Sequence, residues 1–371
     1  MTMRKFVGDP SVSLVAYCAV VLLVASPASA QDTAWERIFG NEQTVCSDGS
    51  SYDFFVRRGD PERVLVHFSG GGACSNAVTC DPDLEPTPYI RNMAQYEPVA
   101  SAGVFDFANA ENPFRDYSVV YAPYCSGDVH LGDTARVYQA PAIEDHAAHP
   151  VEIQHRGMVN ADFVLDWLST NLSNASQLFV SGSSAGAIPS PFFAMRVAEA
   201  YPDARVAHLA DSAAGYLPAV TTTDAAPDDT WGSFARLRER PEFADLSPAD
   251  NSIVRLFEGA ADSAPEIVYA AFDFSEDQVQ KTFSGLLLGG DEGASLLPAI
   301  DANQGEIRSA LERFRSYIAR GAAHTILLRP EFYTLDVNGM RFRDWVDALA
   351  RFESVADVRC DPCVPVAVTR P

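Results

Sequence analysis

The chain has 371 residues and a formal net charge of −23 at pH 7, from 27 basic and 50 acidic residues. Proteins that bind nucleic acid carry Lys and Arg on the contact face, so this charge argues against nucleic acid as a partner. It also disfavours a polyanionic substrate, less strongly, because like charges repel at long range and low salt. Hydrophobic residues make up 47% of the chain, which is enough for one large core or for a domain with an inserted cap.

The first thirty residues have the pattern of a secretory signal peptide. Arg4 and Lys5 give a positive start, an apolar run follows at 11–24, and Ala28-Ser29-Ala30 is a small-residue cleavage site. The apolar run is too short for a stable span, and no other segment is long and apolar enough to cross a bilayer. We expect cleavage after Ala30, a secreted or periplasmic protein without stable membrane insertion, and a single domain over 31–371.

Six cysteines follow the predicted leader. They are Cys46, Cys74, Cys80, Cys125, Cys360 and Cys363. An even number in an exported chain favours disulfides, although fifteen pairings are open. The Cys-x-x-Cys at Cys360 and Cys363 lacks the second pair that a zinc site needs, so we expect no metal site.

In chain order, the hydrophobic pattern predicts short strands that alternate with amphipathic helices. The predicted elements are strands at 52–56, 63–68 and 117–121, a helix at 151–172, a strand at 177–180, a helix at 188–201, strands at 205–210 and 266–271, a helix at 306–319, a strand at 323–328 and a helix at 340–352. This alternation is typical of an α/β fold with a mostly parallel central sheet covered by helices. Residues of about 218–265 break the rhythm, and we interpret them as a helical insertion near the active site, a candidate lid.

A Gly-x-Ser-x-Gly motif lies between a predicted strand and a predicted helix. Its residues are Gly182-Ser183-Ser184-Ala185-Gly186. This context favours a nucleophile elbow, in which a sharp turn presents the hydroxyl of Ser184 and the glycines let the turn close. The alternative is a plain small-residue turn, which the motif alone does not exclude.

A serine nucleophile needs a base and an acid, which follow it in this fold in the order Ser, acid, His. Only His208 and His324 follow Ser184. His208 lies within a predicted buried strand and is better explained as a core histidine, so His324 is the candidate base. Asp273 ends a predicted strand at the right place in the chain and is the candidate acid, with Asp211 as the alternative.

A glycine-rich loop follows the strand predicted at 63–68. Its sequence, Ser69-Gly70-Gly71-Gly72-Ala73-Cys74, is suited to backbone N–H donors for a tetrahedral intermediate. The Gly-Lys-Ser/Thr ending of a phosphate-binding loop is absent from it.

Together these segments resemble the pectin acetylesterase and Notum family of serine carboxylesterases. The two most specific segments are HFSGGGACSNAVTC at 67–80 and YAPYCSGDVHLGD at 121–133. Shorter matches cover the serine, Asp-Ser, acid, histidine and C-terminal cysteine segments; they are GSSAGA at 182–187, LADS at 209–212, FDFSEDQ at 272–278, GAAHT at 321–325 and CDPC at 360–363. The resemblance extends over nearly all of the chain that follows the leader.

The resemblance implies an α/β-hydrolase fold and a role for each of these segments. Ser184 would be the nucleophile, Asp273 the acid and His324 the base. The implied oxyanion hole is made of Gly71, Gly72 and Ala185, and the implied disulfides are Cys74–Cys80, Cys46–Cys125 and a C-terminal pair Cys360–Cys363. The second half of the acid segment matches loosely, which leaves Asp277 as a further candidate acid. Where the family often has an aromatic residue beside the glycines this chain has Ala73, which predicts a more open acyl pocket.

The expected function is hydrolysis of a carboxylic ester without a cofactor. The resemblance implies an O-acetyl or other short acyl ester on a carbohydrate or small molecule. A polyester depolymerase or a lipase would use the same triad. A non-catalytic carbohydrate- or lipid-binding protein is the alternative from another class.

Overall fold

The computed structural model describes residues 34–84, 86–96, 101–143, 147–216, 229–247, 253–289 and 293–363. The predicted signal peptide lies outside these ranges, and so do residues 217–228 and 248–252 of the predicted insertion. Within the described ranges, none of the helices combines the length and the apolar character that crossing a membrane requires.

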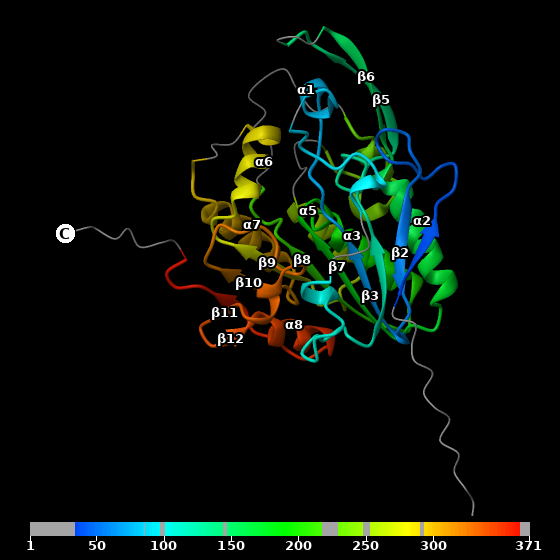
Figure 1. Cartoon of the computed structure of the whole chain (residues 1–371). Coiled ribbons are helices and arrows are strands. Elements are labelled where there is room, and N and C mark those ends of the chain that lie inside the picture. Colours follow the sequence, from blue (N-terminus) through cyan, green and yellow to red (C-terminus); the bar gives the residue numbers. More distant parts are fainter. Residues whose placement is uncertain are drawn as a thin grey trace, which may run out of the picture. The chain divides into compact units, whose positions relative to one another are not determined.

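A nine-stranded sheet forms the centre of the described chain (Figure 1). In sheet order its strands are β1 (Trp35–Phe39), β2 (Asp53–Arg57), β4 (Tyr117–Ala122), β3 (Asp60–Phe68), β7 (Gln177–Ser183), β8 (Arg205–Asp211), β9 (Ala270–Phe274), β10 (Arg315–Ala319) and β13 (Val358–Arg359). The strands from β4 to β13 are parallel, and β1 and β2 pair antiparallel at one edge. The carboxyl ends of the parallel strands therefore meet at one side of the sheet, where α/β proteins place their sites.

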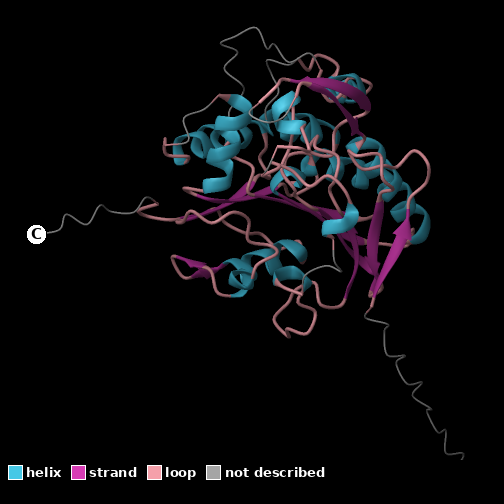
Figure 2. Ribbon diagram, turned by 45° about the horizontal axis from the view of Figure 1, so that its top comes forward, coloured by secondary structure: helices cyan, strands magenta, loops and turns pink. Residues whose placement is uncertain are grey.

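Helices cover both faces of this sheet (Figure 2). The α-helices of the described chain are α1 (Ala77–Cys80), α2 (Gly157–Asn171), α3 (Ser190–Ala200), α4 (Ser233–Leu237), α5 (Ile253–Ser263), α6 (Gln278–Leu288), α7 (Leu297–Ala310) and α8 (Phe342–Ala350). Two small antiparallel pairs lie outside the main sheet; they are β5 (Thr134–Ala140) with β6 (His149–His155), and β11 (Asp336–Val337) with β12 (Met340–Arg341). This mixed α/β arrangement fits an α/β-hydrolase-like fold.

The alternation of side chains along a strand explains the two apolar cores. In β3, Val64 and Val66 pack in one cluster with residues of α2, α3 and α5, whereas Leu65 packs in a second cluster with Trp345 of α8. Successive side chains of a strand point to opposite faces, so a strand buried on both sides must be apolar throughout. The short apolar runs in the sequence therefore indicate strands that are buried on both faces.

Two of the predicted helices are wrong over part of their length. Residues 151–155 belong to β6, and α2 begins only at Gly157. Residues 315–319 form β10 rather than the end of a helix. In the second case, apolar residues three to four positions apart fit a helix, but Tyr317 and Ile318 are buried between β9 and β13, where strand pairing satisfies their backbone groups.

The predicted strand at 323–328 is also wrong, because this segment is a loop that follows β10. Thr325 has a positive φ of 58°, which does not occur in a strand. The N–H groups of Ile326 and Leu327 donate to the carboxylate of Asp211 and not to a neighbouring strand. We call residues 320–329 the base loop.

The described part of the predicted insertion is helical and includes α4 and α5. Helix α5 packs in the core: Ile253, Phe257 and Ala260 are buried in the same cluster as α3. Trp231, ahead of α4, donates its indole N–H to the carbonyl of Cys74 at 2.8 Å. The segment before α4 therefore lies against the glycine-rich loop. Helix α5 packs in the core beside the sheet.

Candidate active site

Ser184 stands at a strained turn directly after β7. Its φ is +55°, a left-handed conformation that residues with a side chain rarely adopt. A Cβ atom at Gly182 would lie 2.0 Å from the carbonyl oxygen of Gly186, and one at Gly186 would lie 2.2 Å from that of Phe68. Both glycines are therefore required for the turn to close against the end of β3, as a nucleophile elbow needs.

The glycine-rich loop lies beside this elbow because β3 and β7 are neighbouring parallel strands. Phe68 pairs with Gly182 at the carboxyl end of the two strands. A Cβ atom at Gly70 would lie 2.6 Å from the Cβ atom of Ser184. The backbone of the loop thus runs in van der Waals contact with the candidate nucleophile.

The backbone N–H groups predicted as oxyanion donors are near that serine. Both glycines pair with the segment at 89–90: Gly72 forms an antiparallel bridge with Tyr89, and the carbonyl of Gly71 accepts the N–H of Ile90 at 2.8 Å. Ala185 is the second residue of the short 3-10 helix Ser184–Gly186, and the first N–H groups of a helix have no partner inside it. All three N–H groups belong to segments that border Ser184.

Buried side chains hold the loop in place. His130 donates its Nε2 hydrogen to the carbonyl of Ser69 at 2.8 Å, and Tyr121 donates its hydroxyl to Ser69 Oγ at 3.0 Å. Burial lowers the pKa of His130 to about 4, so this imidazole is neutral near pH 7 and acts as a fixed donor.

His324 lies on the base loop, at the same end of the sheet. Its Nδ1 atom is 2.7 Å from Oδ2 of Asp277. An ionised carboxylate only accepts hydrogen bonds, so Nδ1 carries the hydrogen and Nε2 is the basic nitrogen. Nε2 is buried and has no hydrogen-bond partner in the described part of the chain, which means that it is not bonded to Ser184 in this structure.

The carboxylate of Asp277 is fully buried at the N-terminus of α6. It accepts the N–H groups of Val279 and Gln280 at 2.9 and 3.0 Å. Gln280 also donates its side-chain amide to the oxygen that accepts from His324, at 3.2 Å. These donors fix the orientation of Asp277 toward the imidazole.

Asp273 faces a different set of groups. It accepts the N–H of Ala214 and the side-chain amides of Gln280 and Gln304, at 3.0, 3.1 and 3.1 Å. Burial raises its pKa to about 7. The imidazole of His324 therefore lies against Asp277 and not against Asp273, which chain order had favoured.

A signal for Asp277 is present in the sequence. Asp277 is followed three residues later by Gln280 and then by an apolar helix, which is the pattern of an N-terminal helix cap with a return contact. In the structure Asp277 is the N-cap of α6, and its side chain accepts the N–H groups of Val279 and Gln280.

Asp211, the alternative acid, contacts the segments on either side of the site. It accepts the hydroxyl of Ser183 at 3.1 Å and the N–H groups of Ile326 and Leu327 at 3.0 and 2.9 Å. No hydrogen bond joins it to His324, because the Nδ1 atom of that ring bonds Asp277 and its Nε2 atom has no partner within the described ranges.

Two of the buried histidines, His67 and His208, are parts of the core. His67 bonds Ser181 at 2.9 Å, and His208 bonds Ser190 at 2.7 Å. Burial lowers the pKa of each to about 3. Both side chains are shielded from solvent, and we exclude them as bases.

Three disulfides pair Cys46 with Cys125, Cys74 with Cys80, and Cys360 with Cys363. These are the pairings that the family resemblance implied. The Cys74–Cys80 bond holds the end of the glycine-rich loop, and the Cys46–Cys125 bond holds the segment after β4. Both segments border the site.

One cluster outside the site could hold a cation. Asp81, Asp83 and His149 bring one ligand atom each to within 4.8 Å of one another. His149 Nε2 lies 3.3 Å from the carboxylate of Asp81, and a hydrogen bond to the carbonyl of Ala147 and the two carboxylates raise the pKa of His149. The raised pKa and the two nearby carboxylates are those of an ion pair, which explains the cluster without a metal.

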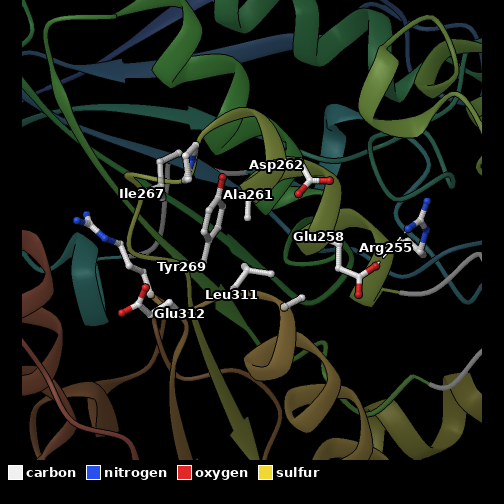
Figure 3. Close-up of a pocket in the computed structure, with 11 residues that line it drawn as sticks. Arg255, Glu258, Ala261, Asp262, Ile267, Tyr269, Leu311 and Glu312 are labelled. Atoms are coloured by element: carbon white, nitrogen blue, oxygen red, sulfur yellow. Dashed lines mark hydrogen bonds and ion pairs between the residues drawn. The ribbon is translucent and has the colours of Figure 1, made fainter.

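A groove of about 510 Å³ lies away from the candidate site (Figure 3). It is lined by residues that precede β9 and β10, among them Ile267, Tyr269 and Leu311, and by charged residues such as Glu258. These strands are parallel to β7, so their amino ends lie at the opposite side of the sheet from Ser184. This groove is not part of the candidate active site.

Comparisons with known proteins identify relatives of the chain. A family model described as Pectinacetylesterase matches residues 29–238. The chain is 28% identical to human Palmitoleoyl-protein carboxylesterase NOTUM over 182 residues, 46% of this chain and 34% of that protein. It is 26% identical to Pectin acetylesterase 11 of Arabidopsis thaliana over 148 residues, 39% of this chain and 35% of that protein.

A third relative has a name of a different kind. The chain is 30% identical over 107 residues, 28% of its length, to Inactive palmitoleoyl-protein carboxylesterase notum1b of Danio rerio, and covers 76% of that protein. By contrast, it spans only 34% and 35% of the length of the human and plant proteins. The range matched by the family model includes Ser184 and the glycine-rich loop but neither Asp277 nor His324.

Proposed function

Because the chain belongs to the pectinacetylesterase family, we propose that it is a serine carboxylic ester hydrolase of α/β-hydrolase fold that removes O-acetyl or other short acyl groups from a carbohydrate or a small ester. The names of its relatives describe carboxylesterases and an acetylesterase, which supports ester chemistry. The three disulfides fit a protein exported to an oxidising compartment.

In this proposal Ser184 is the nucleophile, His324 the base and Asp277 the acid. Nε2 of His324 takes the hydroxyl proton while Oγ of Ser184 bonds to the carbonyl carbon. The tetrahedral intermediate then collapses, and the alcohol leaves with the proton that His324 returns. Water repeats the same steps on the acyl-enzyme and releases the carboxylic acid and the free serine.

Asp277 orients the imidazole and stabilises its protonated form. Its carboxylate binds Nδ1–H of His324, which keeps Nε2 as the proton acceptor. The backbone N–H groups of Gly71, Gly72 and Ala185 are assigned to the oxygen that gains negative charge. Donors of this kind contribute on the order of 3 kcal/mol each to the transition state in other serine hydrolases.

One observation carries the proposal. His324, whose second ring nitrogen has no partner in the described chain, bonds the buried carboxylate of Asp277 at the end of the sheet that also holds a serine with φ of +55°. Strain of this kind costs free energy and is concentrated at functional sites. The core histidines His67 and His208 also have one ring nitrogen without a partner in the described chain, but their other nitrogen bonds a serine and not a carboxylate.

The test is covalent labelling with a fluorophosphonate, which forms a bond to an activated serine. We expect the wild-type protein to be labelled at Ser184, and Ser184→Ala to remain unlabelled. Ser169→Ala in α2 is the control, because it removes an exposed hydroxyl away from the elbow. Equal labelling of wild type and Ser184→Ala, or no labelling of either, would refute the proposed function.

A non-catalytic binding protein is the second candidate, since one relative is named inactive. The labelling experiment separates the two: a binding protein would bind an acetylated carbohydrate without reacting with the probe.

A further inference from the structure

Asp211 joins the two halves of the candidate site without touching the reacting atoms. It ends β8 and is fully buried. It pairs in the sheet with Ser183, the last residue of β7, and accepts the hydroxyl of that serine. Its carboxylate also accepts the N–H groups of Ile326 and Leu327 from the base loop.

Ser212 extends this connection to the residue next to His324. The hydroxyl oxygen of Ser212 accepts the N–H of Thr325 at 3.0 Å, and its own hydrogen points to Asp211 at 3.3 Å. Three consecutive N–H groups of the base loop, at residues 325–327, are therefore held by two adjacent side chains. We call Asp211 and Ser212 the clamp.

Three residues in or next to the clamp have a left-handed backbone conformation. Ser184, Ser212 and Thr325 have φ of 55°, 70° and 58°. Residues with a side chain rarely adopt such angles, and a β-branched threonine does so least of all. Ser212 belongs to the clamp, and Thr325 donates its N–H to Ser212. Ser184 directly follows Ser183, whose hydroxyl bonds Asp211. Strain that persists at several neighbouring positions requires surrounding contacts that enforce it, and the clamp supplies those contacts.

We propose that Asp211 and Ser212 are positioning residues that set the separation between Nε2 of His324 and the hydroxyl of Ser184. The inference rests on the proposed function, because it concerns the geometry of the same reaction. A carboxylate suits this task, since all of its donors come from the elbow, the base loop and Ser212, and it accepts them all at once. An asparagine would turn an N–H group toward at least one of these donors.

The test compares Asp211→Asn with wild type, using p-nitrophenyl acetate turnover and the rate of fluorophosphonate labelling. Both are measured at a temperature where the variant is folded. We expect kcat and the labelling rate to fall about 10- to 100-fold, because a small misplacement of reacting groups has a cost of this size. KM should change less than about twofold, since substrate contacts are unaffected.

Two further variants make the result specific. Ser212→Ala removes only the acceptor of Thr325 and should cause a smaller loss of kcat, less than additive with Asp211→Asn because the two residues share one network. Asp53→Asn is the control: Asp53 is buried and accepts Arg37 and the N–H of Gly40 at the far edge of the sheet, so it should lower the melting temperature without lowering kcat.

Different outcomes refute different statements. Wild-type kcat in Asp211→Asn, or an equal kcat loss in Asp53→Asn at the same folded fraction, would overturn the clamp alone. A loss in Asp211→Asn as large as that in Asp277→Asn would also overturn it, because Asp211 would then be the acid itself. If Asp211→Asn fails to fold, Ser212→Ala decides, and an unchanged kcat there refutes the clamp. An unreactive wild type would remove the proposed function and the clamp together.

Discussion

Asp277 and Asp273 are both fully buried aspartates, four positions apart, yet only one of them bonds the imidazole of His324. Asp277 is held by the first N–H groups of α6, which favour a negative charge at that place. Asp273 is surrounded by amide donors instead. This difference between single residues supports the proposed role of Asp277 in orienting His324, and it gives Asp273 contacts at the end of the sheet only.

The assignment predicts that Asp277→Asn will lower kcat by roughly 10³- to 10⁴-fold, because an amide facing Nδ1 favours the wrong tautomer of His324. Asp273→Asn should lower kcat by less than about tenfold and act mainly on the melting temperature, because it weakens buried hydrogen bonds. Turnover of p-nitrophenyl acetate and thermal unfolding of both variants check this. The opposite ranking would return the role of acid to Asp273.

At the scale of elements, the turn after β7 and the loop after β3 depend on close backbone approach. Gly70→Ala places a methyl group 2.6 Å from Ser183 and Ser184, so we expect the elbow to shift and kcat to fall roughly 10²- to 10³-fold, the size of losing an oxyanion donor. Gly305→Ala in α7 is the control, since a Cβ atom there has nothing within 4 Å. Its kcat should be unchanged and its stability higher by about 0.5–1 kcal/mol. Kinetics and melting temperatures of the pair test the prediction, and wild-type kcat in Gly70→Ala would disprove it.

The elements also explain which parts of the site the sequence predicts. The elbow at Ser184 and the loop at Gly71 are local signals, because each needs glycine at fixed positions next to an apolar strand. The parallel sheet follows from buried apolar runs of strand length. These features do not depend on which distant segment packs against them.

Neighbouring residues alone do not predict the proposed acid or the conformation of the base loop. A position at the end of a strand favours Asp273, and the cap pattern marks Asp277 locally, but which of the two bonds His324 depends on how α6 and the base loop pack together. The base loop around His324 resembles a strand in composition, yet its N–H groups are satisfied by Asp211, a residue more than a hundred positions earlier. Tertiary hydrogen bonds of this kind leave little mark on local sequence pattern.

At the scale of the whole molecule, the net charge of −23 affects the choice of substrate. Long-range repulsion raises the KM for an anionic polymer at low ionic strength, and salt screens it with a Debye length of about 10 Å at 0.1 M. We therefore expect the KM for acetylated pectin to fall as salt is added, whereas the KM for acetylated xylan changes little. Acetate release from both polymers over a salt series measures this, with p-nitrophenyl acetate as the uncharged reference. A flat KM for pectin would show that the net charge is irrelevant to substrate choice.

The buried titratable groups make the stability of the fold depend on pH. Burial lowers the pKa of four imidazoles to about 3 or 4; they are His67, His130, His155 and His208. Each takes up a proton on unfolding below its ordinary pKa of 6.5, so the stability it contributes is present above that pH and is lost as the pH falls toward the folded pKa. Buried aspartates with raised pKa values act in the opposite direction: Asp273 at about 7, and Asp128 and Asp211 at about 6.

His208→Gln isolates one of these contributions, because glutamine can still bond Ser190 but does not titrate. We expect the melting temperature of the variant to fall less steeply than that of wild type between pH 7 and pH 4.5. Thermal unfolding across this range is the measurement, and Gln43→Asn on the exposed surface is a control for substitution itself. Parallel curves for wild type and His208→Gln would contradict the linkage.

The position of His324 on a loop held by β10 has a consequence for newly made chains. The elbow at Ser184 and the glycine-rich loop lie in roughly the first two hundred residues to be synthesised. His324 follows Ser184 by more than a hundred positions. Its loop is held in place only after β10 has joined the edge of β9. If the proposed function holds, a nascent chain is unable to hydrolyse esters until β10 has paired with β9, and this delay follows from the order in which the polypeptide is made.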